Sequence, residues 1–204
     1  MIQLDLPSYQ NLIHDAEIVE ADQHGAKVLL LPDGNYVKLF RRKRLLSSAL
    51  WSPYAQRFVD NCIALRARSI PCPEVIAIFR VPAIERDAVH YRPLIGDTLR
   101  QLIQRGMDET ESTRLRTRIG QFVAHLHAQG IYFRSLHAGN IVLTPTGEAG
   151  LIDLADLRAR RSKLGQWLRK RNLNHLMRNP QEADWITTNG TFLAAYSAAR
   201  QTTA

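Results

Sequence analysis

The sequence has little cysteine, no long apolar run and no repeated segment. Its 204 residues include only two cysteines, Cys62 and Cys72, so no disulfide framework is indicated and a reducing compartment is expected. The apolar stretches, of which Val75–Phe79 is typical, are far too short to cross a bilayer. The first residues, Met1–Asp5, lack the basic start and apolar core of a secretory signal. These absences predict a cytoplasmic protein.

Acidic residues are also scarce, and they are missing altogether from one part of the chain. The sequence holds 27 Lys and Arg against 19 Asp and Glu, so its net charge of +8 favours anionic partners without choosing among them. No acid occurs between Asp156 and Glu182, where eight basic residues follow one another: Arg158, Arg160, Arg161, Lys163, Arg169, Lys170, Arg171 and Arg178.

This basic tract, residues 158–178, also carries apolar residues that predict helices with one apolar and one cationic side: Leu164, Trp167, Leu168, Leu173 and Leu176. Such a surface suits an acidic membrane, an anionic substrate or a nucleic acid, and a merely solvated face is the alternative. The tract offers one aromatic ring, that of Trp167, for base stacking, so nucleic acid ranks last. Residues Trp185–Tyr196 predict a final helix.

A polar loop follows the most regular helix that the sequence predicts. Apolar residues recur at helical spacing within Ser112–Gln129, which predicts an amphipathic helix, and Gly130 ends it. The helix therefore delivers the chain directly into residues 134–140, which are mostly polar.

A tight hairpin comes next. Two short apolar runs, Ile141–Leu143 and Leu151-Ile152, flank the turn-type sequence Thr144–Gly147. Asn140 stands at the entrance of this hairpin and Asp153 at its exit. An amide oxygen and a carboxylate so placed suit a hard divalent cation, because magnesium bound to nucleotide phosphates takes few protein ligands.

At these residues a family resemblance emerges. The run from Arg134 to Asn140, followed by Asp153, resembles the catalytic loop and metal motif of the protein-kinase-like superfamily, in which Arg-Asp-Leu-x-x-x-x-Asn precedes an Asp-Phe-Gly-type turn. The segment Leu-His-Ala-Gly-Asn is similar to the loop of the lipopolysaccharide core (heptose/Kdo) kinase group, which includes toluene tolerance proteins. The resemblance implies that Arg134 is the loop arginine and that Asn140 and Asp153 hold magnesium. Ser135 stands where the family places its catalytic Asp.

The resemblance also implies a fold. We expect an α+β, protein-kinase-like fold with two lobes. Residues 1–95 would form an N-terminal lobe with a small antiparallel sheet, one helix and a hinge at 92–98. Residues 96–204 would form a minimal, mainly helical C-terminal lobe that contains the catalytic-loop hairpin.

Three strands are predicted near the N-terminus, over Ala16–Ala21, Ala26–Leu31 and Tyr36–Phe40. On alternation, Lys38 shares a face with the aromatic residues at both ends of the third strand. The resemblance implies that Lys38 contacts the nucleotide phosphates, whereas an edge-strand lysine is the structural alternative. The turn at Gly25 resembles a much reduced phosphate-covering loop.

Residues 41–69 are expected to be helical after the basic run Arg41–Arg44. The family pairs its strand lysine with a helix Glu, but Asp60 is the only acid here, and a solvated surface Asp is the alternative. Strands are predicted over Val75–Phe79 and Ala88–Leu94. Asp97 or Thr98 is expected to cap a helix that reaches Arg105.

Two residues are candidates to replace the missing loop carboxylate, because the Ser135 hydroxyl can orient a partner but cannot be a carboxylate base. His137 has an ordinary pKa suited to neutral pH. Asp156 could share the metal or reach the acceptor. The alternatives are a His137 that braces the loop by bonding to backbone and an Asp156 that caps the following helix.

Three functions follow from the sequence and the resemblance. The first is an ATP- and magnesium-dependent kinase for a lipopolysaccharide core sugar or another small hydroxyl acceptor. It would work in the cytoplasm, peripherally at the inner membrane, with residues 158–178 facing an anionic sugar-lipid or the membrane. The second is a pseudokinase that binds nucleotide but turns over little. The third is a basic nucleic-acid-binding protein.

Overall fold

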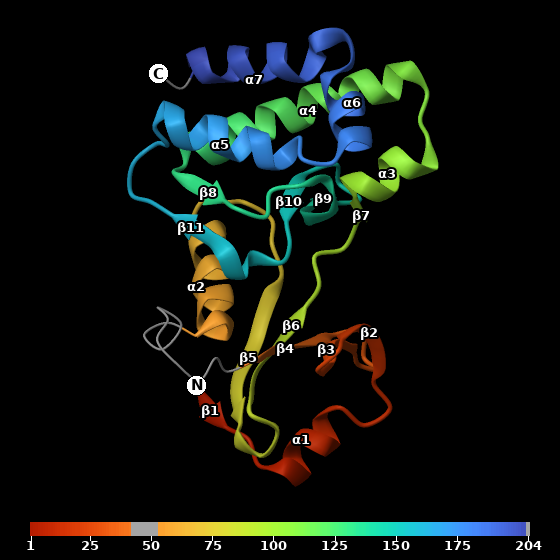
Figure 1. Cartoon of the computed structure of the whole chain (residues 1–204), viewed down its shortest axis with the longest axis vertical. Helices are drawn as coiled ribbons and strands as arrows, with labels where there is room; N and C mark the ends of the chain where they lie inside the picture. The colour runs from red at the N-terminus through yellow and green to blue at the C-terminus, as the bar shows by residue number, and fades with distance from the viewer. Residues whose placement is uncertain (42–52, 203–204) are drawn as a thin grey trace. The chain divides into compact units, whose positions relative to one another are not determined.

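The structure, a computed structural model, describes residues 1–41 and 53–202 (Figure 1). The chain divides into two compact units. Unit 1 comprises Met1–Ile63 and Cys72–Pro93, and unit 2 comprises Ala64–Pro71 and Leu94–Ala204. Unit 1 is built around a sheet and unit 2 mainly from helices, which confirms the predicted α+β class. Most of the basic run Arg41–Arg44 lies outside the described residues.

Within the described residues, unit 1 contains a six-stranded sheet whose order is β1-β5-β6-β4-β3-β2. Only β1 and β5 pair in parallel, and β2, β3 and β4 form the predicted meander. A short 3-10 turn, η1 (Pro82–Ile84), joins the predicted pair β5 and β6. The strands are β1 (Ile2–Gln3), β2 (Glu17–Asp22), β3 (Gly25–Leu30), β4 (Tyr36–Arg41), β5 (Glu74–Val81) and β6 (Arg86–Arg92).

Helix α1 (Leu6–Leu12) packs on one face of this sheet. The Asp5 carboxylate caps it by accepting a hydrogen bond from the Ser8 backbone N–H at 2.8 Å. Seven residues are too few for a stable isolated helix, so tertiary packing must hold it. Tyr9 is buried in one cluster with Val37 and Leu39 of β4. Each such burial contributes roughly 1.5–3 kcal/mol.

Helix α2 (Tyr54–Arg66) supplies Phe58, which packs against the aromatic side chains of the sheet. Its ring centroid lies 6.2 Å from that of Phe40 and 5.4 Å from that of Tyr91. Lys38 shares this face, as predicted, and its Nζ lies 5.9 Å from the centroid of the Phe40 ring. Because β4 lies between β6 and β3, the edge-strand interpretation of Lys38 is wrong.

Unit 2 is organised around α4, which confirms the helix predicted over Ser112–Gln129. Helix α7 runs along α4 in Figure 1, and the two approach closely at Gly120. A Cβ at Gly120 would lie 2.5 Å from the carbonyl oxygen of Phe192, so only glycine permits this packing. The helices are α3 (Leu99–Arg105), α4 (Glu109–Ala128), α5 (Gln166–Leu176), α6 (Pro180–Thr187) and α7 (Thr191–Thr202).

The final helix predicted over Trp185–Tyr196 is wrong, because two helices occupy this segment. Helix α6 ends at Thr187, and a 3-10 turn, η4 (Thr188–Gly190), separates it from α7. Asn189 and Gly190 have positive φ values of 55° and 65°, which interrupt helical hydrogen bonding. The Asn-Gly pair is a turn signal that outweighs the apolar spacing on either side.

Five short strands complete unit 2 in the described residues. Strands β9 and β10 form the predicted hairpin, with Leu143 opposite Ala149 and the Gly147 N–H donating to the Thr144 carbonyl at 2.8 Å. Thr98, not Asp97, caps α3 by accepting from the Gln101 N–H in a capping box. The strands are β7 (Asp97–Thr98), β8 (Ile131–Phe133), β9 (Ile141–Leu143), β10 (Ala149–Leu151) and β11 (Leu157–Ala159).

Candidate active site

The polar loop is placed by a strand pair that sequence patterns did not predict. Strand β8 leads into the loop, and β11 pairs with it antiparallel, so that Leu157 lies opposite Phe133. Asp156, the residue before β11, is thereby brought beside Arg134 and Ser135, the residues after β8. The 3-10 turns η2 (Ala138–Asn140) and η3 (Leu154–Asp156) complete the two segments.

A buried polar network holds β8 in place. The Asn172 amide nitrogen of α5 donates to the Phe133 carbonyl at 2.5 Å, and the Phe133 N–H donates to Asn172 Oδ1 at 3.4 Å. The Asn172 Oδ1 also lies 3.3 Å from His127 Nε2, and the Tyr196 hydroxyl lies 2.8 Å from His127 Nδ1. Burial, the larger cause, lowers the pKa of His127 to about 4, so its ring is neutral at pH 7. Three helices thus brace the strand that leads into the loop.

Asn140 and Asp153 come together at the base of the hairpin. The Ile152 N–H donates to the Asn140 carbonyl at 3.1 Å, which places the residue before Asp153 against Asn140. The Asn140 amide nitrogen donates to the Ser135 carbonyl at 2.9 Å. This hydrogen bond orients the amide so that Asn140 Oδ1 points away from the Ser135 carbonyl and can act as a ligand oxygen. Asp153 has a left-handed backbone with a φ of 54°, a strained conformation for a non-glycine residue.

This donor set fits magnesium carried by a nucleotide. It offers one amide oxygen and one carboxylate, and magnesium in such sites keeps most of its positions for phosphate and water. In the described part of the chain, no group of three or more His, Cys, Asp or Glu could hold a metal by itself. A site assembled jointly with phosphates therefore suits these residues better than a self-contained metal centre.

Ser135 and Asp156 form a hydrogen-bonded pair. The Ser135 hydroxyl donates to Asp156 Oδ2 at 2.5 Å, and Arg134 Nε lies 3.4 Å from the same oxygen. The other oxygen, Asp156 Oδ1, is buried and has no hydrogen-bond partner. The cap role considered for Asp156 is wrong, because its carboxylate turns back to the loop and α5 starts ten residues later, at Gln166.

His137 does not brace the loop through its ring in the part of the chain that the structure describes. Its Nδ1 is buried without a hydrogen-bond partner. Burial lowers the pKa of His137, and the neighbouring Arg100 guanidinium lowers it further, so the ring is neutral at pH 7. A neutral, unpartnered ring nitrogen is able to accept or donate one hydrogen bond to a ligand.

The two other predicted site residues belong to unit 1. Lys38 lies on an interior strand, and Gly25 follows the β2–β3 turn with a φ of 103°. Their roles toward a nucleotide stay predictions. Asp60 of α2 is exposed and accepts a hydrogen bond from Gln56 at 2.9 Å, one turn earlier, which is the arrangement of a surface acid.

Helix α5 bears the centre of the basic tract. Its cationic side is confirmed, since Lys170 and Arg171 are exposed, but the prediction that Trp167 lies on the apolar side is wrong. Trp167 is 67% exposed, and the Arg171 guanidinium lies 5.3 Å from its ring centroid. Among residues 1–41 and 53–202, no helix has the length and apolarity needed to cross a bilayer.

A cavity of about 420 Å³ opens beside Ser135. Sequence analysis singled out the loop residues and Arg178 but gave no role to Arg100, His175, Asn179 or Glu182. Glu182 had a signal, because it is the acid that ends the acid-free stretch. Glu182 accepts from Arg100 Nε at 2.5 Å. The cavity is lined by Arg100, Arg134, Ser135, Leu136, His137, His175, Arg178, Asn179 and Glu182.

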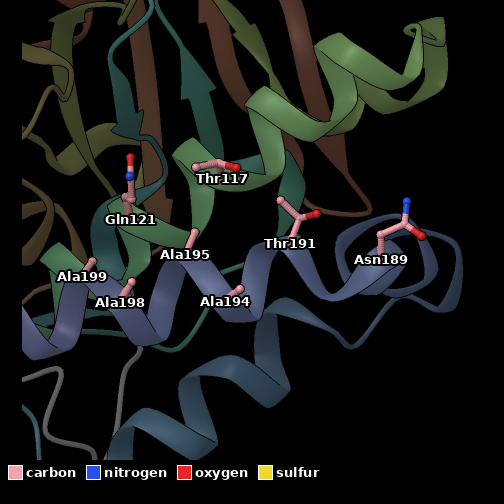
Figure 2. Close-up of a pocket in the computed structure, with 8 residues that line it drawn as sticks. All are labelled: Thr117, Gln121, Asn189, Thr191, Ala194, Ala195, Ala198 and Ala199. Atoms are coloured by element: carbon pink, nitrogen blue, oxygen red, sulfur yellow. The ribbon is translucent and has the colours of Figure 1, made fainter.

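A larger hollow, of about 660 Å³, lies beside α4 and α7 (Figure 2). Figure 2 shows Thr117 and Gln121 on α4, beside α7 with its row of alanines. None of its lining residues titrates in the physiological range or is a strong nucleophile. Its size therefore does not make it a candidate reactive site.

Comparison with known proteins identifies a family for this chain. A family model described as the Lipopolysaccharide kinase (Kdo/WaaP) family matches residues 34–196. The match includes Lys38 and the whole of the loop and hairpin, and it begins after Gly25. A search of curated proteins finds no match. Since the family model covers well over half of the sequence, the chain belongs to the lipopolysaccharide kinase (Kdo/WaaP) family.

Proposed function

We propose that this protein is an ATP- and magnesium-dependent kinase that phosphorylates a hydroxyl of a lipopolysaccharide core sugar. The Ser135–Asp156 pair is the observation that carries the proposal. The loop position that holds the family's catalytic Asp is a serine, yet a carboxylate reaches that serine at 2.5 Å from three residues beyond Asp153. The base that the loop lacks is thus supplied from the end of the hairpin.

Three of the predicted residues have a part in nucleotide binding. Asn140 and Asp153 would hold magnesium with the phosphates, and Lys38 would contact the phosphates. Magnesium, when bound, neutralises charge on the phosphates during transfer. The left-handed backbone of Asp153 fits this role, because strain of this kind collects at functional sites.

Proton removal from the acceptor runs through Ser135. The acceptor hydroxyl donates to Ser135 Oγ, whose own proton already points at Asp156 Oδ2. As the acceptor oxygen attacks the γ-phosphorus, its proton passes to Ser135 Oγ and the serine proton passes to Asp156. The bond from phosphorus to the β–γ bridging oxygen breaks, and ADP leaves. Such base assistance contributes about 10²–10⁴-fold in rate.

A pseudokinase is the second candidate, and specific residues favour it. Ser135 replaces the loop Asp, Asp60 is a surface acid, and the turn at Gly25 is short. A pseudokinase would bind nucleotide at Asn140 and Asp153 without transferring phosphate. The position of Asp156 favours the enzyme over this alternative.

The basic tract supports a location at an anionic surface. Trp167 is exposed beside Lys170 and Arg171, which combines an interfacial aromatic ring with positive charge. Anionic lipid is the partner we propose for this face, because lipopolysaccharide precursors lie in such a surface. Nucleic acid ranks last, since the Trp167 ring is already stacked by Arg171.

Two measurements on one preparation test the function. ATP with magnesium should raise the melting temperature, and Asp153→Ala should abolish the rise. Phosphate should then pass from γ-labelled ATP to lipopolysaccharide core oligosaccharide. A melting shift without transfer would establish the pseudokinase, and no shift at all would remove both candidates.

A further inference from the structure

The cavity beside Ser135 carries polar atoms that the protein itself does not satisfy. Glu182 Oε2 and His137 Nδ1 are both buried and without hydrogen-bond partners. The Glu182 side chain is only 5% exposed, so water from bulk solvent has little access to it. A buried polar atom without a partner is costly, which indicates that a ligand completes it.

Glu182 Oε2 and His137 Nδ1 are suited to hydrogen bonds with hydroxyl groups. The Glu182 carboxylate already accepts from Arg100 with its other oxygen, so Oε2 has the geometry of a fixed acceptor. The neutral His137 ring exchanges a hydrogen bond with a group that both donates and accepts. Hydroxyls on a sugar ring supply both kinds of partner.

The same cavity has one positive charge in excess. Arg100 pairs with Glu182 and Arg134 pairs with Asp156, so carboxylates match two of the three arginines. Within the described residues, no hydrogen bond or ion pair engages the Arg178 guanidinium, which is exposed at the cavity. A guanidinium is suited to bidentate binding of a carboxylate or a phosphate.

We propose that this cavity is the acceptor site and that it selects a sugar carrying an anionic group. Glu182 and His137 bind ring hydroxyls, and Arg178 binds the anion, a carboxylate or a phosphate. This inference rests on the proposed function and adds its specificity-determining residues. The cavity volume of about 420 Å³ lies in the range of small-ligand sites, roughly 300–1,000 Å³. Ser135 lines the same cavity, so a bound hydroxyl lies next to the reacting group.

The test uses three probes that share one ring: glucose, glucuronic acid and glucose 6-phosphate. Their dissociation constants are measured by NMR titration of the full-length protein without ATP or magnesium. Glucuronic acid or glucose 6-phosphate should bind at least about tenfold more tightly than glucose, and the tighter of the two identifies the anion. Equal binding of all three probes, or no binding of any, would overturn the proposal.

Variants then assign the contacts. Arg178→Gln should weaken the preferred anionic sugar about tenfold and leave glucose unchanged. Glu182→Gln should weaken all three probes. Arg114→Gln is the matched control, because it removes one exposed positive charge of α4 that does not line the cavity. An equal loss in Arg114→Gln and Arg178→Gln would show only general charge attraction and would overturn the site.

Failure of this inference is distinguishable from failure of the kinase proposal. Anionic-sugar binding that Arg178→Gln weakens, together with no phosphate transfer, leaves the cavity assignment standing and removes the enzyme. If phosphate passes to core oligosaccharide and Arg178→Gln leaves its KM unchanged, the enzyme stands and the cavity assignment is removed. Under our proposal Arg178→Gln raises KM about tenfold and leaves kcat nearly unchanged.

Discussion

Two polar clusters of unit 2, one at β8 and one at the cavity beside Ser135, differ in how their hydrogen bonds are completed. In the first, His127, Asn172 and Tyr196 are buried and satisfy one another and the Phe133 backbone. In the second, at the cavity, Glu182 Oε2 and the His137 ring nitrogen lack protein partners. We infer that the first cluster, here called the scaffold cluster, stabilises the fold and that the second, the cavity cluster, binds a ligand. Burial alone does not separate the two roles, whereas hydrogen-bond completion does.

The largest effect should come from the Ser135–Asp156 pair, which follows β8 and carries the proton in the proposed reaction. Ser135→Ala and Asp156→Asn should each lower kcat about 10²–10⁴-fold, because either change interrupts the path of the proton. The double variant should be no slower than the worse single variant, since the two groups act as one unit. Steady-state transfer rates with core oligosaccharide measure this. Multiplicative losses would show that the two residues act independently.

Breaking the scaffold cluster should cost stability. Asn172→Leu removes the amide that donates to the Phe133 carbonyl and leaves the buried His127 Nε2 without a partner, and we expect a loss of about 3 kcal/mol in the free energy of unfolding. Urea denaturation measures it. Asn174→Leu, two residues along the same helix but exposed, is the control and should change stability by no more than about 0.5 kcal/mol. A similar small change for Asn172→Leu would contradict the scaffold role.

The scaffold also predicts a pH dependence. The pKa of His127 is about 4 when folded and ordinarily 6.5, so the unfolded chain binds the extra proton first as pH falls. Stability is therefore fully present above pH 6.5 and declines toward pH 4, with a loss of roughly 2 kcal/mol between pH 7 and pH 5. The decline should be flatter in His127→Gln, as urea titrations at several pH values will show. Identical slopes in both proteins would rule out His127 as the source.

The smallest effect should come from the cavity cluster. Glu182→Gln keeps an oxygen for Arg100, whose side chain is 41% exposed, so no uncompensated charge is left buried and the free energy of unfolding should change by less than about 1 kcal/mol. Urea denaturation in the absence of ligand measures it. A loss as large as that of Asn172→Leu would place Glu182 in the scaffold and erase the distinction between the clusters.

Local signals in the sequence predicted the elements that frame the site. The apolar stripe of α4 and the turn residues around Gly147 each act within one element, so pattern and structure agree. The resemblance named Asn140 and Asp153, and their family is confirmed. The apolar spacing on both sides of Asn189 predicts one helix, whereas the Asn-Gly turn makes two.

The contacts that give the site its chemistry were beyond local patterns. Asp156 reaches Ser135 only because β11, three residues long, pairs with β8 in one register. A strand so short has no periodicity to detect. Glu182 is held in the cavity by its ion pair with Arg100, a residue 82 positions earlier in the sequence. Tertiary pairing decides both contacts.

The central claim is that Asp156 supplies, through Ser135, the carboxylate that the loop lacks. A single-turnover experiment with excess enzyme, magnesium, γ-labelled ATP and core oligosaccharide tests it most directly. Our account predicts that the wild type transfers label to the oligosaccharide, and that Asp156→Asn binds ATP equally well but transfers at least about a hundredfold more slowly. Equal transfer by both proteins, or ATP binding with no transfer by the wild type, would contradict it.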